Sequence, residues 1–244
     1  MLFLRVPISD SMKFNSSLVF QSLVDLFFPR TCLGCVFFLT PYEKGLCIGC
    51  QLQLSPTNFN LDANNPLAVK LREFIPIYAP MALFYFQKGG AFTHLIHLLK
   101  YKSVKKSGAY LGHWLALSLK ESPLFRDLTG ILVVPLHPKK RRQRGYNQSE
   151  LIAVEISSVL NIKVYPKALV RIKNTLSQTK AGKVERWESM QNAFCCAPDF
   201  QNQKGHFLLV DDVITTGATL VSCAQALFKE NTIKLSVAAL GYRL

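Results

Sequence analysis

A continuous apolar run, a polar turn and a helical pattern follow one another directly within residues 207–229. The run Phe207-Leu208-Leu209-Val210 predicts a strand, and the continuous apolar run at residues 131–135 is of the kind expected for a strand buried on both faces of a sheet. A strand that leads straight into a helix is the repeating unit of α/β folds. This stretch therefore indicates an α/β domain built on a parallel sheet.

The same alternation recurs through most of the chain. Apolar runs predict further strands at residues 77–86, 131–135, 162–165 or 168–172, and 235–240. Helical spacing of apolar residues predicts helices at residues 92–101, 109–120, 151–160 and 220–229. Asn147 and Glu150 are spaced like a capping box ahead of residues 151–160. The predicted fold class is a parallel sheet with flanking helices.

Length and composition limit the number of domains. A chain of 244 residues, 49% of them apolar, can bury one sizeable core and still carry a small appendage. Residues 51–80 contain several Pro and Asn residues and are expected to form a connector. We predict a module over residues 1–60, beginning with an amphipathic helix near residues 15–28, and an α/β domain over residues 61–244.

No targeting or membrane-spanning segment is expected. Arg5, Pro7 and Asp10 interrupt the first residues, so no apolar region precedes a cleavage site. The apolar stretch at residues 26–39 is broken by Pro29 and Arg30 and is too short to cross a bilayer. These features predict a soluble, cytoplasmic protein.

Four of the seven cysteines form two Cys-x-x-Cys pairs, Cys32 with Cys35 and Cys47 with Cys50. Two such turns supply the four soft ligands of a closed tetrahedral Zn²⁺ site. A structural zinc ribbon is therefore predicted, in which Gly34 and Gly49 let amide groups approach the thiolates. The alternatives are a module that has lost its metal and a pair of redox dithiols.

The polar turn after residue 210 carries the most informative chemistry. Asp211 and Asp212 end the predicted strand, and the hydroxyl-rich turn Thr215-Thr216-Gly217-Ala218-Thr219 opens the following helix. Backbone amides at a helix amino terminus hold phosphate well. Adjacent carboxylates fit a neutral diol and a hydrated Mg²⁺ beside that phosphate. Phosphate, diol and metal together describe 5-phosphoribosyl 1-pyrophosphate.

Two other interpretations of this turn remain open. The acids and threonines could form only a strand end and an ordinary helix cap. A phosphatase-like nucleophile is the second alternative, since Asp211, Val213 and Thr215 follow an Asp-x-x-x-Thr spacing but lack the second acid of that pattern. Neither a Walker loop nor a Rossmann glycine fingerprint occurs in the sequence.

Residues 208–219 resemble the signature of the type I phosphoribosyltransferases, and the whole chain resembles the ComF family of competence-associated phosphoribosyltransferase-like proteins. An arginine-rich stretch at residues 141–148, Arg-Arg-Gln-Arg-Gly-Tyr-Asn-Gln, matches the family shortly after residues 133–136. Further matches are Arg171, Thr175, Gln178, Arg186, Asn192, Ala193, Phe194 and the four cysteines of the ribbon. The similarity spans most of the chain in the expected order.

The resemblance implies an enzyme that uses Mg²⁺ and 5-phosphoribosyl 1-pyrophosphate and transfers the phosphoribosyl group to an unidentified acceptor. Asp211 and Asp212 would be the catalytic carboxylates that contact the ribose hydroxyls, and the turn from Thr215 to Thr219 would enclose the 5-phosphate. A basic loop would face the pyrophosphate, and residues 172–186 would form a mobile hood. The implied loop residues are Lys139, Lys140, Arg141, Arg142 and Arg144, and the hood residues are Arg171, Thr175, Gln178 and Arg186.

The charge of the chain supports a second hypothesis. A formal net charge of +14 favours polyanions as partners. A catalytically silent protein that binds nucleotides or single-stranded DNA with the same fold, within a DNA-uptake system, is therefore the alternative. The basic residues of the loop could also form only a solvated face.

Overall fold

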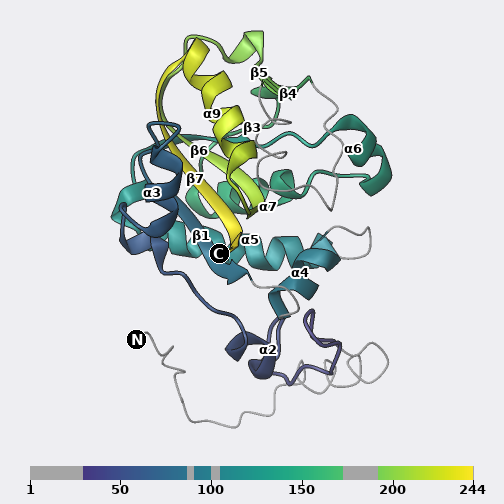
Figure 1. Cartoon of the computed structure of the whole chain (residues 1–244). Coiled ribbons are helices and arrows are strands. Elements are labelled where there is room, and N and C mark those ends of the chain that lie inside the picture. The colour runs from purple at the N-terminus through teal and green to yellow at the C-terminus, as the bar shows by residue number, and fades with distance from the viewer. Residues whose placement is uncertain (1–29, 87–90, 100–104, 173–191, 244) are drawn as a thin grey trace.

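The computed structural model describes residues 30–86, 91–99, 105–172 and 192–243. Its centre is a five-stranded sheet in the order β1-β7-β6-β2-β3, with every neighbouring pair parallel (Figure 1). The strands are β1 (Pro80–Phe86), β2 (Leu128–Val133), β3 (Val164–Tyr165), β6 (Lys204–Ile214) and β7 (Thr232–Arg243). The predicted α/β fold with a parallel sheet is confirmed.

Helices cover both faces of this sheet (Figure 1). One apolar cluster joins the sheet to α3 (Pro66–Arg72) and α9 (Ala218–Glu230). The other joins it to α4 (Ala91–Leu99), α5 (Lys105–Glu121) and α7 (Gln148–Leu160). The smaller elements are α2 (Ile48–Leu52), α6 (Pro138–Arg144), the 3-10 turns η1 (Phe59–Leu61), η2 (Pro123–Phe125) and η3 (Pro198–Phe200), and the antiparallel pair β4 (Leu169–Arg171) and β5 (Phe194–Cys196).

The apolar run in β6 explains why the sheet needs two cores. Leu208 and Val210 belong to the cluster under α5 and α7, whereas Phe207 and Leu209 belong to the cluster under α9. Successive side chains of a strand point to opposite faces, so a strand covered on both sides must be apolar at every position. All four side chains are buried.

The predicted connector at residues 51–80 is more ordered than its composition indicated. Asn65 caps α3, since its Oδ1 atom accepts hydrogen bonds from the amides of Leu67 and Ala68, and Pro66 occupies the first helical position. The Asn65 amide also donates to the carbonyls of Asp62 and Pro80. These bonds fix the chain where Pro and Asn alone predicted a loose segment.

The basic loop after β2 is a short helix instead. Pro138 starts α6 and Nδ1 of His137 accepts a hydrogen bond from the Lys139 amide. Gly145 ends the helix at φ 79°, a left-handed conformation that glycine adopts without strain. The Lys and Arg side chains therefore project from a helical turn, and none of them is buried.

Other local predictions differ mainly at their ends. Both candidate strands between residues 162 and 172 form, but in different sheets, since β3 is an edge strand of the main sheet and β4 pairs with β5. Strand β6 continues through both aspartates to Ile214. The helix predicted near residues 15–28 lies outside the described residues.

A chain of polar contacts crosses the amino end of the sheet. Nδ1 of His206 lies 2.6 Å from Oδ1 of Asp127, and Nε2 lies 2.7 Å from Oγ of Ser236. This order of groups resembles the triad of serine hydrolases. The Ser236 hydroxyl is fully buried at 0% exposure, however, so no substrate can reach it. The contacts instead join β6 and β7 to the residue that precedes β2.

Burial lowers the pKa of His206, although the Asp127 carboxylate opposes this effect. The Lys234 ammonium, 2.8 Å from Asp127, and then His206 lower the pKa of Asp127 to about 2. Both shifts are in the same direction: the folded state binds these protons less readily than the unfolded chain. The free energy of unfolding therefore falls as the pH falls through the range in which each of these two groups gains its proton.

Acidification from pH 7 to pH 5 should lower the thermal midpoint. An unfolded chain protonates His206 near a pKa of about 6.5, whereas the folded protein keeps it neutral to lower pH. Asp127 should add a second loss between about pH 4 and pH 2. Calorimetry of His206→Gln should show a lower thermal midpoint, which corresponds to a loss of about 1–3 kcal/mol in the free energy of unfolding. The thermal midpoint of this variant should also change less between pH 7 and pH 5 than that of the wild type.

The exposed His113 provides the control for this experiment. His113→Gln should retain the wild-type slope. An unchanged slope in His206→Gln would show that His206 does not link folding to pH.

Candidate functional site

Asp211 and Asp212 lie near the carboxyl end of β6, at the centre of the sheet. Oδ1 of Asp211 accepts hydrogen bonds from the Ser149 hydroxyl at 3.1 Å and from the Asp212 amide at 2.8 Å. Burial and then the Asp212 carboxylate raise the pKa of Asp211. Asp211 therefore holds its proton more readily than an isolated aspartate, and a cation or several hydrogen-bond donors at this position would stabilise the doubly ionised pair.

The turn after β6 leads into α9 as the sequence predicts. Gly217 is the N-cap residue at φ 86°, and no acidic residue lies in the first turn of the helix. Thr216 Oγ1 accepts a hydrogen bond from the Ala218 amide at 3.4 Å. Thr215, Thr216 and Thr219 are each half-buried. A helix of thirteen residues with this amino terminus offers partial positive charge to an anion.

Helix α3 supplies two contacts to this turn that sequence reasoning missed. Nζ of Lys70 donates a hydrogen bond to the Thr215 carbonyl at 2.9 Å. A Cβ atom at Gly217 would lie 2.9 Å from the Leu71 side chain, so α3 packs closely against the turn. No local signal identifies Lys70, because 145 residues separate it from Thr215. Lys70 places a cation beside the predicted phosphate turn.

Pairing of β2 with β6 brings the basic helix to the same edge of the sheet. Val133 is in register with Val210, and the Val134 amide donates to the Val210 carbonyl. Asn147 caps α7 and also donates from Nδ2 to the Val134 carbonyl at 3.0 Å. The segment that leads from β2 to α6 therefore begins beside Asp211.

Cations from two separate segments meet near the start of α6. Slight desolvation and the charges of Arg171, Lys139 and Lys140 lower the pKa of His137. Burial lowers the pKa of Arg171 as well, although Cys223 and Asp211 oppose this shift. Arg171 thus lies within electrostatic range of both α6 and the acid pair. The sequence assigned it to a separate hood segment.

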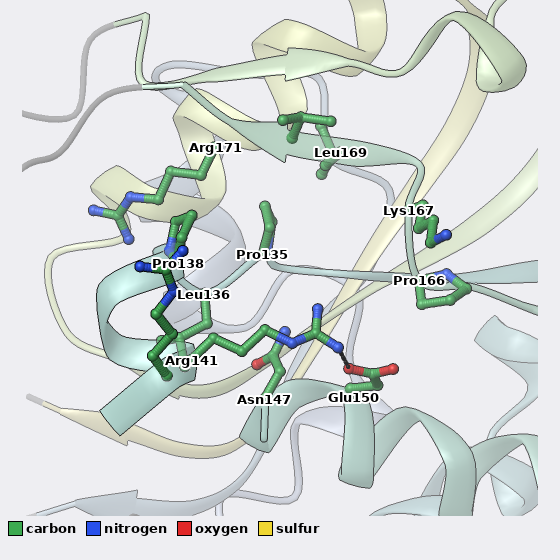
Figure 2. Close-up of a pocket in the computed structure, with 12 residues that line it drawn as sticks. Pro135, Leu136, Pro138, Arg141, Asn147, Glu150, Pro166, Lys167, Leu169 and Arg171 are labelled. Carbon is green, nitrogen blue, oxygen red and sulfur yellow. Dashed lines mark hydrogen bonds and ion pairs between the residues drawn. The ribbon is translucent and has the colours of Figure 1, made fainter. Parts of the chain in front are cut away.

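A cleft of about 400 Å³ opens between α6 and the loop before β4 (Figure 2). Arg141 crosses it and its Nη2 atom lies 3.5 Å from Oε2 of Glu150. Of the predicted pyrophosphate-binding residues, Arg141 and Arg142 line the cleft, whereas Lys139, Lys140 and Arg144 do not. Arg144 instead donates to the Gln148 side chain.

The lining of the cleft comes from three segments of the chain. The lining residues are Pro135, Leu136, Pro138, Arg141, Arg142, Asn147, Glu150, Pro166, Lys167, Leu169, Val170 and Arg171. Among the predicted hood residues, only Arg171 belongs to this set. Thr175, Gln178 and Arg186 lie outside the described residues. Glu150 was predicted to complete a capping box, but its carboxylate pairs with Arg141.

The four paired cysteines form the second candidate site. The Sγ atoms of Cys32, Cys35, Cys47 and Cys50 all lie within 4.8 Å of one another. Sulfur atoms in a tetrahedral Zn²⁺ site lie about 3.8 Å apart, given a Zn–S distance of about 2.3 Å. The donor set and its spacing therefore fit a metal such as zinc.

Local hydrogen bonds shape the two cysteine turns. The amides of Gly34 and Cys47 donate to Sγ of Cys32 at 3.3 and 3.2 Å. Burial raises the pKa of Cys32, but these backbone donors outweigh it and bring the pKa to about 7. Glu43 accepts from the amides of Thr40 and Ile48, which ties the segment between the turns to the second turn.

The cysteine module packs onto the main core. Cys32, Leu46, Cys50 and Leu54 belong to the apolar cluster that includes α5. A Cβ atom at Gly45, whose φ is 72°, would lie 2.7 Å from the Tyr110 ring. The module is therefore anchored to α5 by close contact between backbone and ring.

Comparison with known proteins finds relatives that are named for competence and for DNA utilization. The chain is 27% identical over 227 residues to "Competence protein F" of Haemophilus influenzae, an alignment that covers 86% of this chain and 96% of that protein. It is 30% identical over 149 residues to "DNA utilization protein YhgH" of Escherichia coli K12 and of Salmonella typhimurium. Those alignments cover 59% of this chain but only 63% of the relatives' own length. No protein-family model matches the chain.

Within the described part of the chain, no helix has the length and apolar character needed to span a membrane. The relative from Haemophilus influenzae matches the chain over almost its full length, and the four cysteines meet at one point. These relatives, together with the four-cysteine cluster, support the expected resemblance to the ComF family.

Proposed function

We propose that the protein binds 5-phosphoribosyl 1-pyrophosphate together with Mg²⁺ and transfers its phosphoribosyl group to an acceptor. The observation that carries this proposal is the position of an acid pair, a helix amino terminus and a basic helix at one edge of the sheet. Ligands of open α/β sheets bind at this carboxyl edge. Each chemical group of the donor has a complementary protein group there.

The ribose and its 5-phosphate match the β6 side of the site. Carboxylates of Asp211 and Asp212 accept hydrogen bonds from a diol, and the first turn of α9 binds a phosphate through its amides. Lys70 adds positive charge at Thr215. Mg²⁺, when bound with the donor, would neutralise part of the pyrophosphate charge.

The pyrophosphate matches the α6 side of the site. Transfer forms a bond between C1 of the ribose and a nucleophilic atom of the acceptor and breaks the bond between C1 and a pyrophosphate oxygen, which leaves with the electron pair. Cations placed where the charge develops lower the barrier to this step. Arg141, Arg142 and Arg171 line the cleft and can supply that charge.

DNA binding is the second candidate function. Two relatives are named for competence and for DNA utilization. The net charge of +14 favours a polyanion, and α6 presents exposed Lys and Arg side chains. Phosphoribosyl transfer and DNA binding are both compatible with a cytoplasmic protein that takes part in DNA uptake. The basic surface of α6 would hold single-stranded DNA.

We also propose that the four cysteines hold structural Zn²⁺. Four thiolates close the coordination sphere and leave no open position for a reacting group. Zinc would replace the thiol protons and hold the two turns together.

The double substitution Asp211→Asn, Asp212→Asn should weaken 5-phosphoribosyl 1-pyrophosphate binding at least about a hundredfold, or about 2.7 kcal/mol. The thermal midpoint should not fall, because the change removes the repulsion and burial cost that raise the pKa of Asp211. Calorimetric titration with Mg²⁺ present measures the first effect, and thermal unfolding measures the second. Unchanged affinity in the folded variant would remove the basis of the proposed donor site.

Gly34→Ala should reduce the zinc content well below the expected one ion per chain. A Cβ atom at Gly34 would lie 2.7 Å from Sγ of Cys50, whereas one at Gly49 would lie 4.0 Å from Sγ of Cys47. Gly49→Ala is therefore the matched control and should retain the metal. Metal analysis of the two purified variants decides the point, and equal zinc content in both would contradict the predicted geometry.

Single-stranded DNA should bind with a strong dependence on salt. Lys139→Gln with Arg142→Gln should lower the slope of log affinity against log salt by about 1.4, since two cations are lost. Lys120→Gln with Arg126→Gln removes two exposed cations near the opposite edge of the sheet and should leave the slope closer to wild type. Fluorescence anisotropy measures both, and equal slopes would show that α6 does not bind DNA.

A further inference from the structure

The cysteines of the chain differ in their access to solvent. All seven lie within the described residues, and Cys35 is the only exposed one. Within the cysteine module, Cys47 is half-buried, and Cys32 and Cys50 are buried in the apolar cluster that includes α5. An oxidant in solution therefore reaches Cys35 more readily than any other cysteine of the chain.

The exposed thiol has a second thiol beside it. Sγ of Cys35 lies 3.6 Å from Sγ of Cys47, although the two cysteines belong to different turns and are 12 residues apart in the sequence. A disulfide has a sulfur–sulfur distance of about 2.05 Å, so the two atoms need to approach by only about 1.6 Å. Rotation about the side-chain bonds provides a shift of this size. Cys47 is therefore within reach as a reaction partner.

The other two sulfurs of the module are held more firmly. Sγ of Cys32 accepts hydrogen bonds from the amides of Gly34 and Cys47 at 3.3 and 3.2 Å. Sγ of Cys50 packs so closely on the first turn that a Cβ atom at Gly34 would lie 2.7 Å from it. A disulfide at either sulfur would disturb these contacts and the buried packing around them. Pairing of Cys35 with Cys47 leaves both buried sulfurs where they are.

We infer that Cys35 is an oxidation site for hydroperoxides, that Cys47 converts the oxidised residue into a disulfide, and that this disulfide releases the metal from the module. The evidence is the exposure of Cys35, its short distance to Cys47 and the firm hold on the other two sulfurs. Solvent access and the nearby thiol are the features of cysteines that oxidise reversibly.

The reaction has two steps. Sγ of Cys35 attacks one peroxide oxygen, the O–O bond breaks, and the second oxygen leaves with the electron pair as water or an alcohol. Cys35 is then a sulfenic acid. Sγ of Cys47 attacks the sulfur of that acid, the S–O bond breaks, and the oxygen leaves as water. The two sulfurs together lose two electrons, which the two peroxide oxygens gain, and protons from the thiols or from water complete the products.

The disulfide removes two of the four proposed metal ligands. Cys32 and Cys50 remain, and two thiolates do not close the tetrahedral sphere of a structural Zn²⁺ site. A hydroperoxide would thus weaken the link between the two turns of the module. Release of the metal rests on the proposed zinc site, whereas formation of the disulfide does not.

Oxidation of the zinc-loaded full chain tests the inference, with hydrogen peroxide as the probe. A chromogenic chelator follows the release of zinc, and mass spectrometry of the unreduced digest identifies the disulfide. Release should reach about one ion per chain as the Cys35–Cys47 disulfide forms, and dithiothreitol with added Zn²⁺ should reverse both changes. A first disulfide between any other pair of cysteines, or zinc retained after this disulfide has formed, would overturn the inference.

Substitution by histidine removes one thiol and keeps a zinc ligand, since three cysteines and one histidine also form structural zinc sites. Cys35→His should lose zinc to hydrogen peroxide at least about tenfold more slowly than the wild type. Cys47→His should stop at the sulfenic acid of Cys35, which dimedone traps for mass spectrometry.

Cys195→Ser is the control, because Cys195 is half-buried and lies outside the module. This variant should release zinc at the wild-type rate. Equal rates in Cys35→His and Cys195→Ser would place the oxidation at another residue and overturn the inference. If a histidine variant holds no zinc, the loss of thiols is followed instead, and the same difference in rate is expected.

The oxidation site and the zinc site fail in different ways. A chain that binds no zinc but first forms the Cys35–Cys47 disulfide supports the oxidation site and refutes the zinc site together with the release of metal. A chain that binds zinc and keeps it in hydrogen peroxide supports the zinc site and refutes the inference.

Discussion

The arrangement of the site depends on the parallel pairing of β2 with β6. This pairing aligns Val133 with Val210, so the acid pair and the segment leading to α6 leave the sheet side by side. Asn147 and Ser149 at the start of α7 reinforce it, one through the Val134 carbonyl and the other through the Asp211 carboxylate. A single helix amino terminus therefore holds two neighbouring strand ends in place. Loss of this register would separate negative from positive groups without changing any of them.

Groups of opposite charge share this edge and are kept apart by the backbone. Asp211 and Asp212 lie within β6, whereas Arg141 and Arg142 project from a separate helix. Arg171 is half-buried, lines the same cleft as Arg141 and Arg142, and has its guanidinium 5.4 Å from the centre of the Phe194 ring. A substrate that carries hydroxyls at one end and phosphates at the other can satisfy both sets. Strand β6 holds the acidic side chains and helix α6 the basic ones, and this separation keeps the two sets from neutralising each other.

Local chemistry made part of this predictable. The run from Phe207 to Val210 and the two Cys-x-x-Cys turns each contain their own structural signal, so the central strand and the meeting of the cysteines followed from sequence. The approach of Lys70 to Thr215 did not, because tertiary packing of α3 creates it. The ionic contact of Glu150 was likewise missed, since a capping box and a pairing with Arg141 need the same carboxylate. Spacing along the chain cannot decide that competition.

The anchoring of the cysteine module has a consequence for how the protein responds to its surroundings. Cys32 and Cys50 are ligand candidates and also members of the apolar cluster that contains α5 and β6 residues. Metal that binds only the folded module adds its binding free energy to folding. The stability of this face of the sheet would then depend on the concentration of free metal. Scarcity of a trace element would therefore shorten the lifetime of the protein, although its proposed substrate site contains none of the metal ligands.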